Sequence, residues 1–296
     1  MTEVATLQTL KVGIPKGSLQ ESTFDLFRRA GFEMNLSSSR SYFPSIDDKE
    51  LSCIMFRSQE MSRYVQDGII DVGITGYDWI QENESDVVEV CELVYSKATA
   101  KPARWVLAVP RDSKTTKPED LAGGVIATEL VGVTRRFFAS RHIDVRVEFS
   151  WGATEVKARF VDGIVEITET GSSLEANNLR IVADIMTSTP RLIAGKVAWA
   201  DPWKRAKAES LAMLLRGAIE GRNKVGMKMN VGRKDLEIVV KMLPAEKSPT
   251  VSALADQDFV AVEVIMEEQA ARNLIPKLRR AGASGIFTYS LNTVIP

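Results

Sequence analysis

The sequence predicts an α/β protein of two or three domains, on the strength of three observations. Between residues 125 and 179, short β-branched strands alternate with helical segments of about ten residues, which is typical of a parallel, doubly wound sheet. After residue 221 the expected order becomes strand, helix, strand, strand, helix, strand, which indicates a small ferredoxin-like module. With 296 residues, 45% hydrophobic and 26% charged, the chain has room for more than one core.

The elements of the first part follow from apolar runs bounded by turn residues. A strand at 10–14 ends in Pro15-Lys16-Gly17-Ser18, and a helix over 19–30 closes at Gly31. Lys16 thus follows a strand, at the edge where α/β proteins bind ligands, although a solvated turn lysine explains it equally well. The next elements are expected at 51–56 (strand), 59–68 (helix), 69–75 (strand) and 87–94 (strand).

The polar stretch 95–103 is interpreted as a first crossing between two lobes. Asp201 and Pro202 then supply a cap and first turn for a long helix ending near Ile219. Strands are expected at 104–109, 125–129, 145–149 and 163–167, and helices at 133–141, 152–160 and 173–179. After a linker at 221–224, the module is expected as strand 225–231, helix 233–243, a short strand near 251–254, strand 259–266, helix 268–281 and strand 285–289.

The stretch Asp162–Leu179 reads as strand, turn and helix, and it suits a sugar phosphate. Ser172 and Glu175 have capping-box spacing, which marks a helix start near Leu174. Such a start offers unpaired backbone N–H groups and the positive end of the helix dipole to an anion. The spacing alone fits an ordinary capped helix.

Neighbouring side chains favour the ligand. Glu166 and Glu169 can accept hydrogen bonds from vicinal hydroxyls, as on a ribose, and Gly171 allows close approach. Phosphate oxygens can receive hydrogen bonds from the hydroxyls of Thr170, Ser172 and Ser173.

Cationic side chains elsewhere could hold further phosphate. Arg57 follows a strand, and its planar guanidinium can hold two oxygens at once. Arg135 lies in the first turn of a helix where pyrophosphate could bind, although a solvated basic face explains it as well. Gly76 suggests close approach of the backbone to a ligand, or a simple turn.

Several function classes are disfavoured by composition. A formal net charge of −1 argues against non-specific nucleic-acid binding. Neither an 18-residue apolar run nor a secretory signal is visible, so we expect a cytoplasmic protein without a membrane partner. His142 is the only histidine, and no P-loop or His/Cys metal spacing occurs, so no catalytic side chain and no protein-held metal are assigned. Cys53 and Cys91 lie in apolar runs and are expected to be buried free thiols.

The sequence resembles the ATP phosphoribosyltransferase family over essentially the whole chain. The stretch 162–179 looks like the family's phosphoribosyl-pyrophosphate loop. The family usually has Asp and Pro shortly after Arg57, where this chain has Glu60 and Ser62, which puts the local turn in question. Further motifs in family order are Ile14–Leu19, Asp71–Gly76, Ala127–Leu130, Thr134–Arg136 and Ser150–Glu155.

The resemblance implies a two-lobed core like that of periplasmic binding proteins, plus a C-terminal ferredoxin-like regulatory domain. Lobe I is expected at 1–96 with a return segment at 186–220, lobe II at 97–185, and the regulatory domain at 221–296. The implied reaction transfers the phosphoribosyl group of phosphoribosyl pyrophosphate to N1 of the adenine of ATP, releasing pyrophosphate, as the first step of histidine biosynthesis.

Roles for individual residues follow from the same resemblance. Mg²⁺, bound mainly through phosphate oxygens, is the expected cofactor. Phosphoribosyl pyrophosphate is assigned to Glu166, Glu169, Thr170, Gly171, Ser172, Ser173 and Leu174, and ATP or pyrophosphate to Lys16, Arg57, Thr75, Gly76 and Arg135.

The last domain is implied to bind histidine as a feedback inhibitor, at Lys247, Ser248, Thr250 and Ser252. A homohexamer, possibly built from dimers, is implied as well, and the sequence alone equally allows a dimerisation domain. Three alternatives stay open: another phosphoribosyltransferase, a two-lobed binding protein without catalysis, which would normally carry a secretion signal, and a ligand-sensing regulator, which would need a helix-turn-helix.

Overall fold

The computed structural model describes residues 8–95, 102–244 and 249–295. They form two compact units: the first comprises the described residues within 1–28 and 32–212, and the second those within 29–31 and 213–296. The division falls inside helix α8 (Pro202–Glu220), close to the boundary expected at 221. Among the described helices, none is long and apolar enough to cross a membrane.

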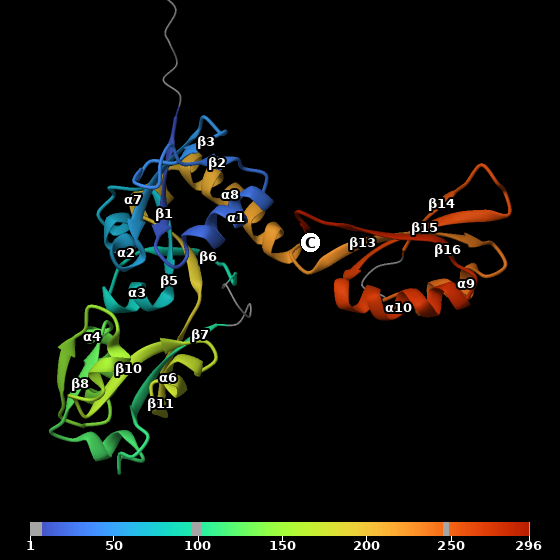
Figure 1. Ribbon diagram of the computed structural model, residues 1–296. Coiled ribbons are helices and arrows are strands. Elements are labelled where there is room, and N and C mark those ends of the chain that lie inside the picture. Colours follow the sequence, from blue (N-terminus) through green and yellow to red (C-terminus); the bar gives the residue numbers. More distant parts are fainter. Residues whose placement is uncertain (1–7, 96–101, 245–248, 296) are drawn as a thin grey trace, which may run out of the picture. The chain divides into compact units, whose positions relative to one another are not determined.

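Lobe I of the first unit is built on a five-stranded sheet of order β4-β1-β5-β12-β6 (Figure 1). β1 pairs in parallel with β4 and β5, whereas β12 is antiparallel to β5 and β6. The strands are β1 (Leu10–Lys16), β4 (Leu51–Arg57), β5 (Val72–Gly76), β6 (Val88–Glu92) and β12 (Pro190–Ala194); β2 (Met34–Asn35) and β3 (Ser45–Ile46) form a small ladder. The helices are α1 (Gln20–Arg29), α2 (Ser58–Gln66), α3 (Tyr77–Glu82), α7 (Lys196–Ala200) and the start of α8.

Lobe II is built on a second five-stranded sheet of order β11-β7-β10-β8-β9. Its strands are β7 (Ala103–Pro110), β8 (Val125–Thr128), β9 (Arg146–Phe149), β10 (Gly163–Thr168) and β11 (Leu179–Ser188). Its helices are η1 (Pro118–Leu121), α4 (Val131–Ala139), α5 (Thr154–Lys157) and α6 (Ser172–Ala176).

Three details of lobe II correct the sequence-based expectation. The sheet is mixed rather than parallel, because β7 carries the chain into the lobe and β11 carries it out in the opposite direction. Residues 186–188, expected in the segment that returns to lobe I, still belong to lobe II, and the crossing occurs at Thr189. The helix expected at 152–160 shrinks to one turn, since Gly152 and Ala153 have positive φ values of 98° and 49°.

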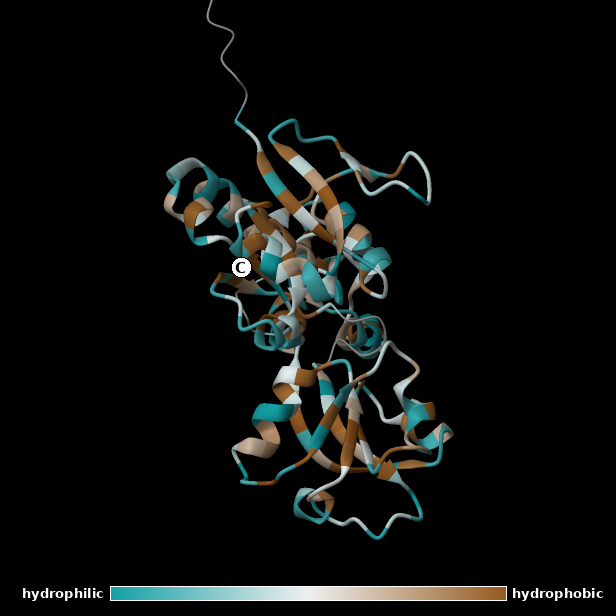
Figure 2. Cartoon of the chain, turned by 90° about the vertical axis from the view of Figure 1, so that its left-hand side faces the viewer, coloured by the Kyte–Doolittle hydropathy of each residue, from teal (hydrophilic) through white to brown (hydrophobic). Residues whose placement is uncertain are grey.

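The central strands of both sheets are buried, which is why they are almost continuously apolar. β5 is buried along its whole length, and β7 is buried from Trp105 to Val109. Figure 2 shows hydrophobic residues concentrated on the strands of the sheets. Burial on both faces is characteristic of α/β sheets covered by helices on each side.

The second unit confirms the expected βαββαβ order, including the short strand near residue 251. Its antiparallel sheet has the order β14-β15-β13-β16, with α9 and α10 on one face (Figure 1). Alternate residues of β13 and β15 pack against these helices. The elements are β13 (Lys224–Gly232), α9 (Leu236–Met242), β14 (Thr250–Ala253), β15 (Phe259–Glu267), α10 (Glu268–Arg280) and β16 (Ser284–Ser290).

Cys53 and Cys91 are not joined in a disulfide. Cys53 is buried, and burial raises the pKa of its thiol to about 12. Cys91 is only partly buried, so the expectation of full burial is wrong for this residue.

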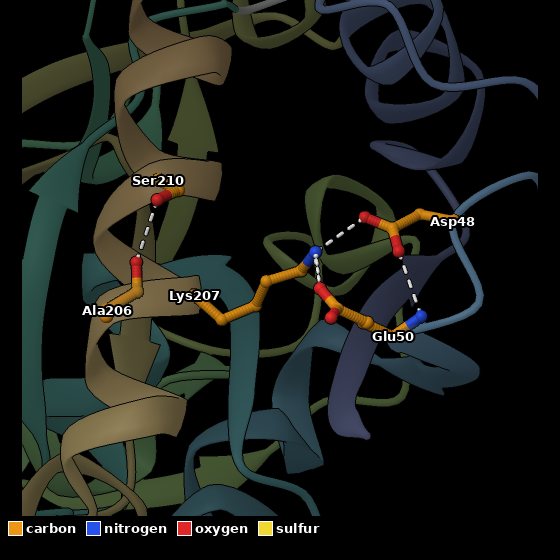
Figure 3. Close-up of polar contacts among 5 residues, drawn as sticks. All are labelled: Asp48, Glu50, Ala206, Lys207 and Ser210. Atoms are coloured by element: carbon orange, nitrogen blue, oxygen red, sulfur yellow. Dashed lines mark hydrogen bonds and ion pairs between the residues drawn. The ribbon is translucent and has the colours of Figure 1, made fainter. Parts of the chain in front are cut away.

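Two ion pairs made by one partly buried lysine join helix α8 to lobe I. Lys207 Nζ lies between Asp48 Oδ2 at 2.7 Å and Glu50 Oε2 at 2.6 Å, as Figure 3 shows. Burial alone would raise the pKa of Asp48, but the hydrogen bonds from Lys207 and from the N–H of Glu50, with the charge of Lys207, lower it overall.

We expect Lys207→Met to lower the stability of the first unit by about 1 kcal/mol at neutral pH, because partly solvated ion pairs contribute little. A carboxylate with a lowered pKa stabilises the fold above its unfolded pKa, and this is lost as pH falls through the folded pKa. The difference in melting temperature between wild type and variant should therefore shrink on acidification from pH 7 through the Asp48 titration. A difference that stays constant over this range would contradict the assignment.

Candidate active site

A cavity of about 1140 Å³ opens between the two lobes of the first unit. It lies at the carboxyl ends of β1, β4 and β5 in lobe I and of β8 and β10 in lobe II. Strand ends are where side chains and turns of an α/β sheet become free to meet a ligand. Of the predicted ligand contacts, Lys16, Arg57, Gly76, Glu166 and Glu169 line the cavity.

The lobe I side of the cavity is cationic. Lys16 and Arg57 are register partners at the ends of the parallel strands β1 and β4, so both side chains start from the same sheet edge. Lys16 Nζ lies 3.7 Å from the centre of the Tyr42 ring. This cation–π contact holds the ammonium at the cavity rim. Two neighbouring cations suit a polyphosphate.

The lobe II side is acidic. Glu166 lies on β10 next to Val165, and Val165 pairs with Thr128 at the end of β8. Glu129 directly follows Thr128, and Glu129 and Glu166 both line the cavity. Burial raises the pKa of Glu166; hydrogen bonds from the Ile167 N–H and Thr154 oppose this, and the charges of Glu155 and Glu129 add to it. Carboxylates at such an edge can accept hydrogen bonds from ligand hydroxyls.

The turn after β10 is held by its own hydroxyls. Gly171 N donates to Thr168 Oγ1 at 2.7 Å, and the Thr170 and Ser172 hydroxyls are 2.9 Å apart. Ser173 Oγ donates to Glu155 Oε1 at 2.5 Å. Gly171 has φ of +84°, a left-handed conformation that side chains with a Cβ rarely adopt.

This geometry corrects the predicted capping box. Ser172 is the first residue of α6, Gly171 occupies the N-cap position, and no side chain caps the helix. Because α6 has only five residues, its dipole is small. Any affinity of this turn for an anion must come from the backbone N–H groups and exposed hydroxyls of the loop.

The other predicted contacts do not line the cavity. Thr170, Gly171, Ser172 and Ser173 form the turn directly after the lining residue Glu169, whereas Thr75, Arg135 and Leu174 lie elsewhere. Thr75 is fully buried, and its hydroxyl donates to the Ser58 carbonyl at 2.8 Å. Arg135 is exposed on α4 and does not line the cavity, while Leu174 is buried in the lobe II core. The structure therefore does not support the side chains of Thr75, Arg135 and Leu174 as ligand contacts.

In the second unit, Thr250 and Ser252 lie exposed on β14, and Lys247 and Ser248 fall outside the described residues.

Sequence reasoning missed several cavity residues. Glu129 follows β8 and Asp78 follows β5, and each lies in or next to a family motif, so position at a strand end is the signal that could identify them. Tyr42, Trp105 and Ser188 also line the cavity, but no local pattern marks them, because they are brought there by the tertiary fold.

The departure at Ser62 has a structural role. Ser62 is fully buried in α2, donates to the Trp79 carbonyl at 3.2 Å and accepts from Asn83 Nδ2 and Ser85 Oγ at 2.9 Å each. It therefore joins α2 to α3 and to the turn that follows. A proline at this position could form none of these bonds.

Fold and site together define a two-lobed α/β protein that places a cationic strand edge opposite an acidic, hydroxyl-rich loop, as transfer of a phosphorylated sugar requires. The ATP phosphoribosyltransferase family matches residues 57–217, and the HisG C-terminal domain family matches residues 221–293. The chain belongs to the ATP phosphoribosyltransferase family.

Individual relatives agree. The chain is 56% identical to ATP phosphoribosyltransferase 1 of Geobacter sulfurreducens over 97% of this chain and 99% of that protein. Its structure resembles an ATP phosphoribosyl transferase (HisG:HisZ) complex from Thermotoga maritima, with a TM-score of 0.61 and 29% identity over 72% of this chain and 99% of that chain. Tv2483 bound to L-arginine shares the fold alone, with a TM-score of 0.50 and 11% identity over 72% of this chain and 85% of that one.

The predicted family, fold class and function are therefore confirmed. The reaction is the pentosyl transfer that opens histidine biosynthesis, with ATP and phosphoribosyl pyrophosphate as substrates.

Proposed function

We propose that the transfer takes place in the interlobe cavity, with phosphoribosyl pyrophosphate on lobe II and the ATP or pyrophosphate charge on lobe I. The observation that carries this assignment is the opposition of Lys16 and Arg57 on one wall to Glu166 and Glu169 on the other. Adenine N1 attacks the anomeric carbon, the bond from that carbon to the pyrophosphate oxygen breaks, and pyrophosphate leaves with its electron pair.

The 5′-phosphate is proposed to bind the loop from Thr170 to Ser173 and the backbone of Leu174. Glu166 and Glu169 are proposed to accept hydrogen bonds from the ribose hydroxyls. Gly76, at the carboxyl end of β5, also lines the cavity, and a Cβ there would collide with the Asp78 carboxylate. The reaction then depends on holding the two reacting atoms in line and stabilising charge, without a covalent intermediate on the protein.

Enzymes of this family generally need a divalent metal, and we propose Mg²⁺. Among the described residues no group of three or more His, Cys, Asp or Glu side chains could hold a metal ion by itself. The donors that line the cavity fit Mg²⁺ bound chiefly by substrate, because they are carboxylate and hydroxyl oxygens and this ion keeps phosphate and water ligands. Glu129 and Glu166 are the carboxylates placed to support it, and its charge would stabilise the leaving pyrophosphate.

The assignment is tested by near-UV absorbance of the full chain with ATP, phosphoribosyl pyrophosphate and Mg²⁺, with pyrophosphatase added to pull the equilibrium. Absorbance should rise only when both substrates and the metal are present, and Arg57→Ala should raise the ATP requirement without changing the melting temperature. If Lys16→Ala and Arg57→Ala both left the kinetics unchanged, the proposed lobe I site would be wrong.

We propose further that the second unit binds histidine and inhibits the reaction, and that the protein assembles as a hexamer in the cytoplasm. Thr250 and Ser252 face the side of the sheet that carries no helix, because they pair with Glu263 and Ala261 rather than with residues of the helix-facing core. Polar side chains on an open sheet face can receive a small zwitterion. Histidine should suppress the absorbance rise, and Ser252→Ala should weaken that suppression while leaving the uninhibited rate unchanged; equal inhibition of both proteins would remove this residue from the site.

A further inference from the structure

Helix α3 directly follows strand β5 of lobe I, but hydrogen bonds join both of its ends to lobe II. At its start, Asp78 Oδ2 accepts a hydrogen bond of 2.7 Å from Trp105 Nε1 on β7. At its end, the Glu82 carboxylate accepts the backbone N–H groups of Gly132 at 2.8 Å and of Val133 at 2.9 Å. Figure 1 shows α3 beside α4.

The Glu82 carboxylate is complementary in charge and hydrogen bonding to the N-terminus of α4. The first N–H groups of a helix have no partner within it and carry the positive end of the dipole, so a carboxylate that accepts two of them is favoured. Gly132 suits this approach, because a Cβ there would lie 3.3 Å from both the carbonyl and a carboxylate oxygen of Glu82. The start of α4, where the sequence suggested a bound pyrophosphate, is thus occupied by a carboxylate of the chain itself.

Apolar packing fixes the middle of α3. Trp79 packs against the core of lobe II and lies edge-on to Trp105, with ring centres 6.2 Å apart. Outside this core, Arg136 of α4 bonds to the Gln81 carbonyl and pairs with Glu84, both on exposed surface. The buried contacts, rather than the exposed ion pair, are therefore expected to fix the orientation.

The orientation of the lobes matters for the reaction, because the two substrates are assigned to opposite walls. Displacement of one reacting partner by about 1 Å can cost about 100-fold in rate. Neither Glu82 nor α4 lines the cavity. A residue there can change the alignment of the substrates without touching them.

We propose that Glu82 is a positioning residue, which caps α4 across the lobe boundary and so holds the two substrate-binding walls in register for the transfer. This inference rests on the proposed assignment of the substrates to the two lobes. It makes the cavity a preformed site with a fixed lobe orientation rather than one that opens freely about the crossing segments.

The test is steady-state kinetics of Glu82→Gln in the full chain. Glutamine keeps the size but offers one acceptor and places an NH₂ group against a backbone N–H. We expect kcat to fall about 10- to 100-fold, with KM for each substrate within about threefold of wild type. Hydrogen exchange of the peptide covering the start of α4 should accelerate at the same time.

Two further variants make the result decisive. Glu84→Gln removes one charge from the same boundary but only from the exposed pair with Arg136, and it should change kcat less than twofold. Gly132→Ala disturbs the contact from the side of lobe II and should reproduce the kcat effect in weaker form.

Unchanged kcat in Glu82→Gln would overturn the proposal, and so would an equal loss in Glu84→Gln. A parallel rise of both KM values with a lowered melting temperature would also overturn it, because the contact would then be merely structural. Failure of the substrate assignment itself would show separately, as unchanged kinetics in the Lys16 and Arg57 variants.

Discussion

Gly171→Val is expected to raise the KM for phosphoribosyl pyrophosphate by about 100-fold or more while leaving the fold intact. A Cβ at this position would meet nothing within 4 Å, so the effect does not come from a clash. It comes from φ of +84°, because β-branched residues avoid the left-handed region and the turn would rearrange. That rearrangement would move the N–H and hydroxyl groups that we assign to the 5′-phosphate, each worth up to about 1.5–3 kcal/mol when the acceptor is charged.

A matched substitution separates backbone conformation from side-chain size. Gly171→Asn adds a side chain that tolerates the left-handed region, so it should recover most of the affinity lost in the valine variant. Initial rates at varied phosphoribosyl pyrophosphate and saturating ATP measure both variants, with the melting temperature as a check on folding. Equal and small effects of the two substitutions would remove the loop from the substrate site.

The sequence predicted those parts of the fold and site that local patterns determine. Strand ends such as Lys16 and Arg57, and the turn containing Gly171, follow from apolar runs that stop at turn residues. The sequence did not predict that the end of β11 still belongs to lobe II. A strand that leaves one lobe has the same local pattern as a strand that begins the next lobe.

The positions of Thr75 and Arg135 away from the cavity have the same explanation, because a local pattern does not determine where a side chain lies in the fold. Thr75 and Arg135 occupy motif positions, but burial and helix face decide whether a side chain reaches the cavity. Ser172 and Glu175 have the spacing of a capping box, but α6 begins at Ser172 with Gly171 at the N-cap, so Ser172 lies inside the first turn rather than at the cap. Tyr42, Trp105 and the contact of Glu82 with α4 depend on pairing between distant segments, which no single sequence window contains.

Glu166→Gln is expected to lower kcat/KM for phosphoribosyl pyrophosphate about 100-fold and at the same time to raise the melting temperature at neutral pH. The loss follows because the amide replaces one acceptor by a donor that faces the assigned ribose hydroxyls, which leaves buried polar groups unpaired. The gain follows from the raised pKa of Glu166: burial, reinforced by Glu155 and Glu129, penalises its ionised form.

The sign of the pH dependence makes this prediction sharp. When the folded pKa of an acid lies above its unfolded value, the folded state binds more protons between the two, so the contribution of that group to stability falls as pH rises through that interval. Wild type should therefore lose melting temperature relative to Glu166→Gln as pH rises from about 4 towards neutrality, and above the folded pKa the gap should stay constant. Glu175→Gln, on the exposed side of α6, serves as the matched control and should show neither effect. If the glutamine variant were less stable than wild type at neutral pH, the ionised Glu166 would be stabilising the fold. The predicted stability cost of its charge would then be wrong.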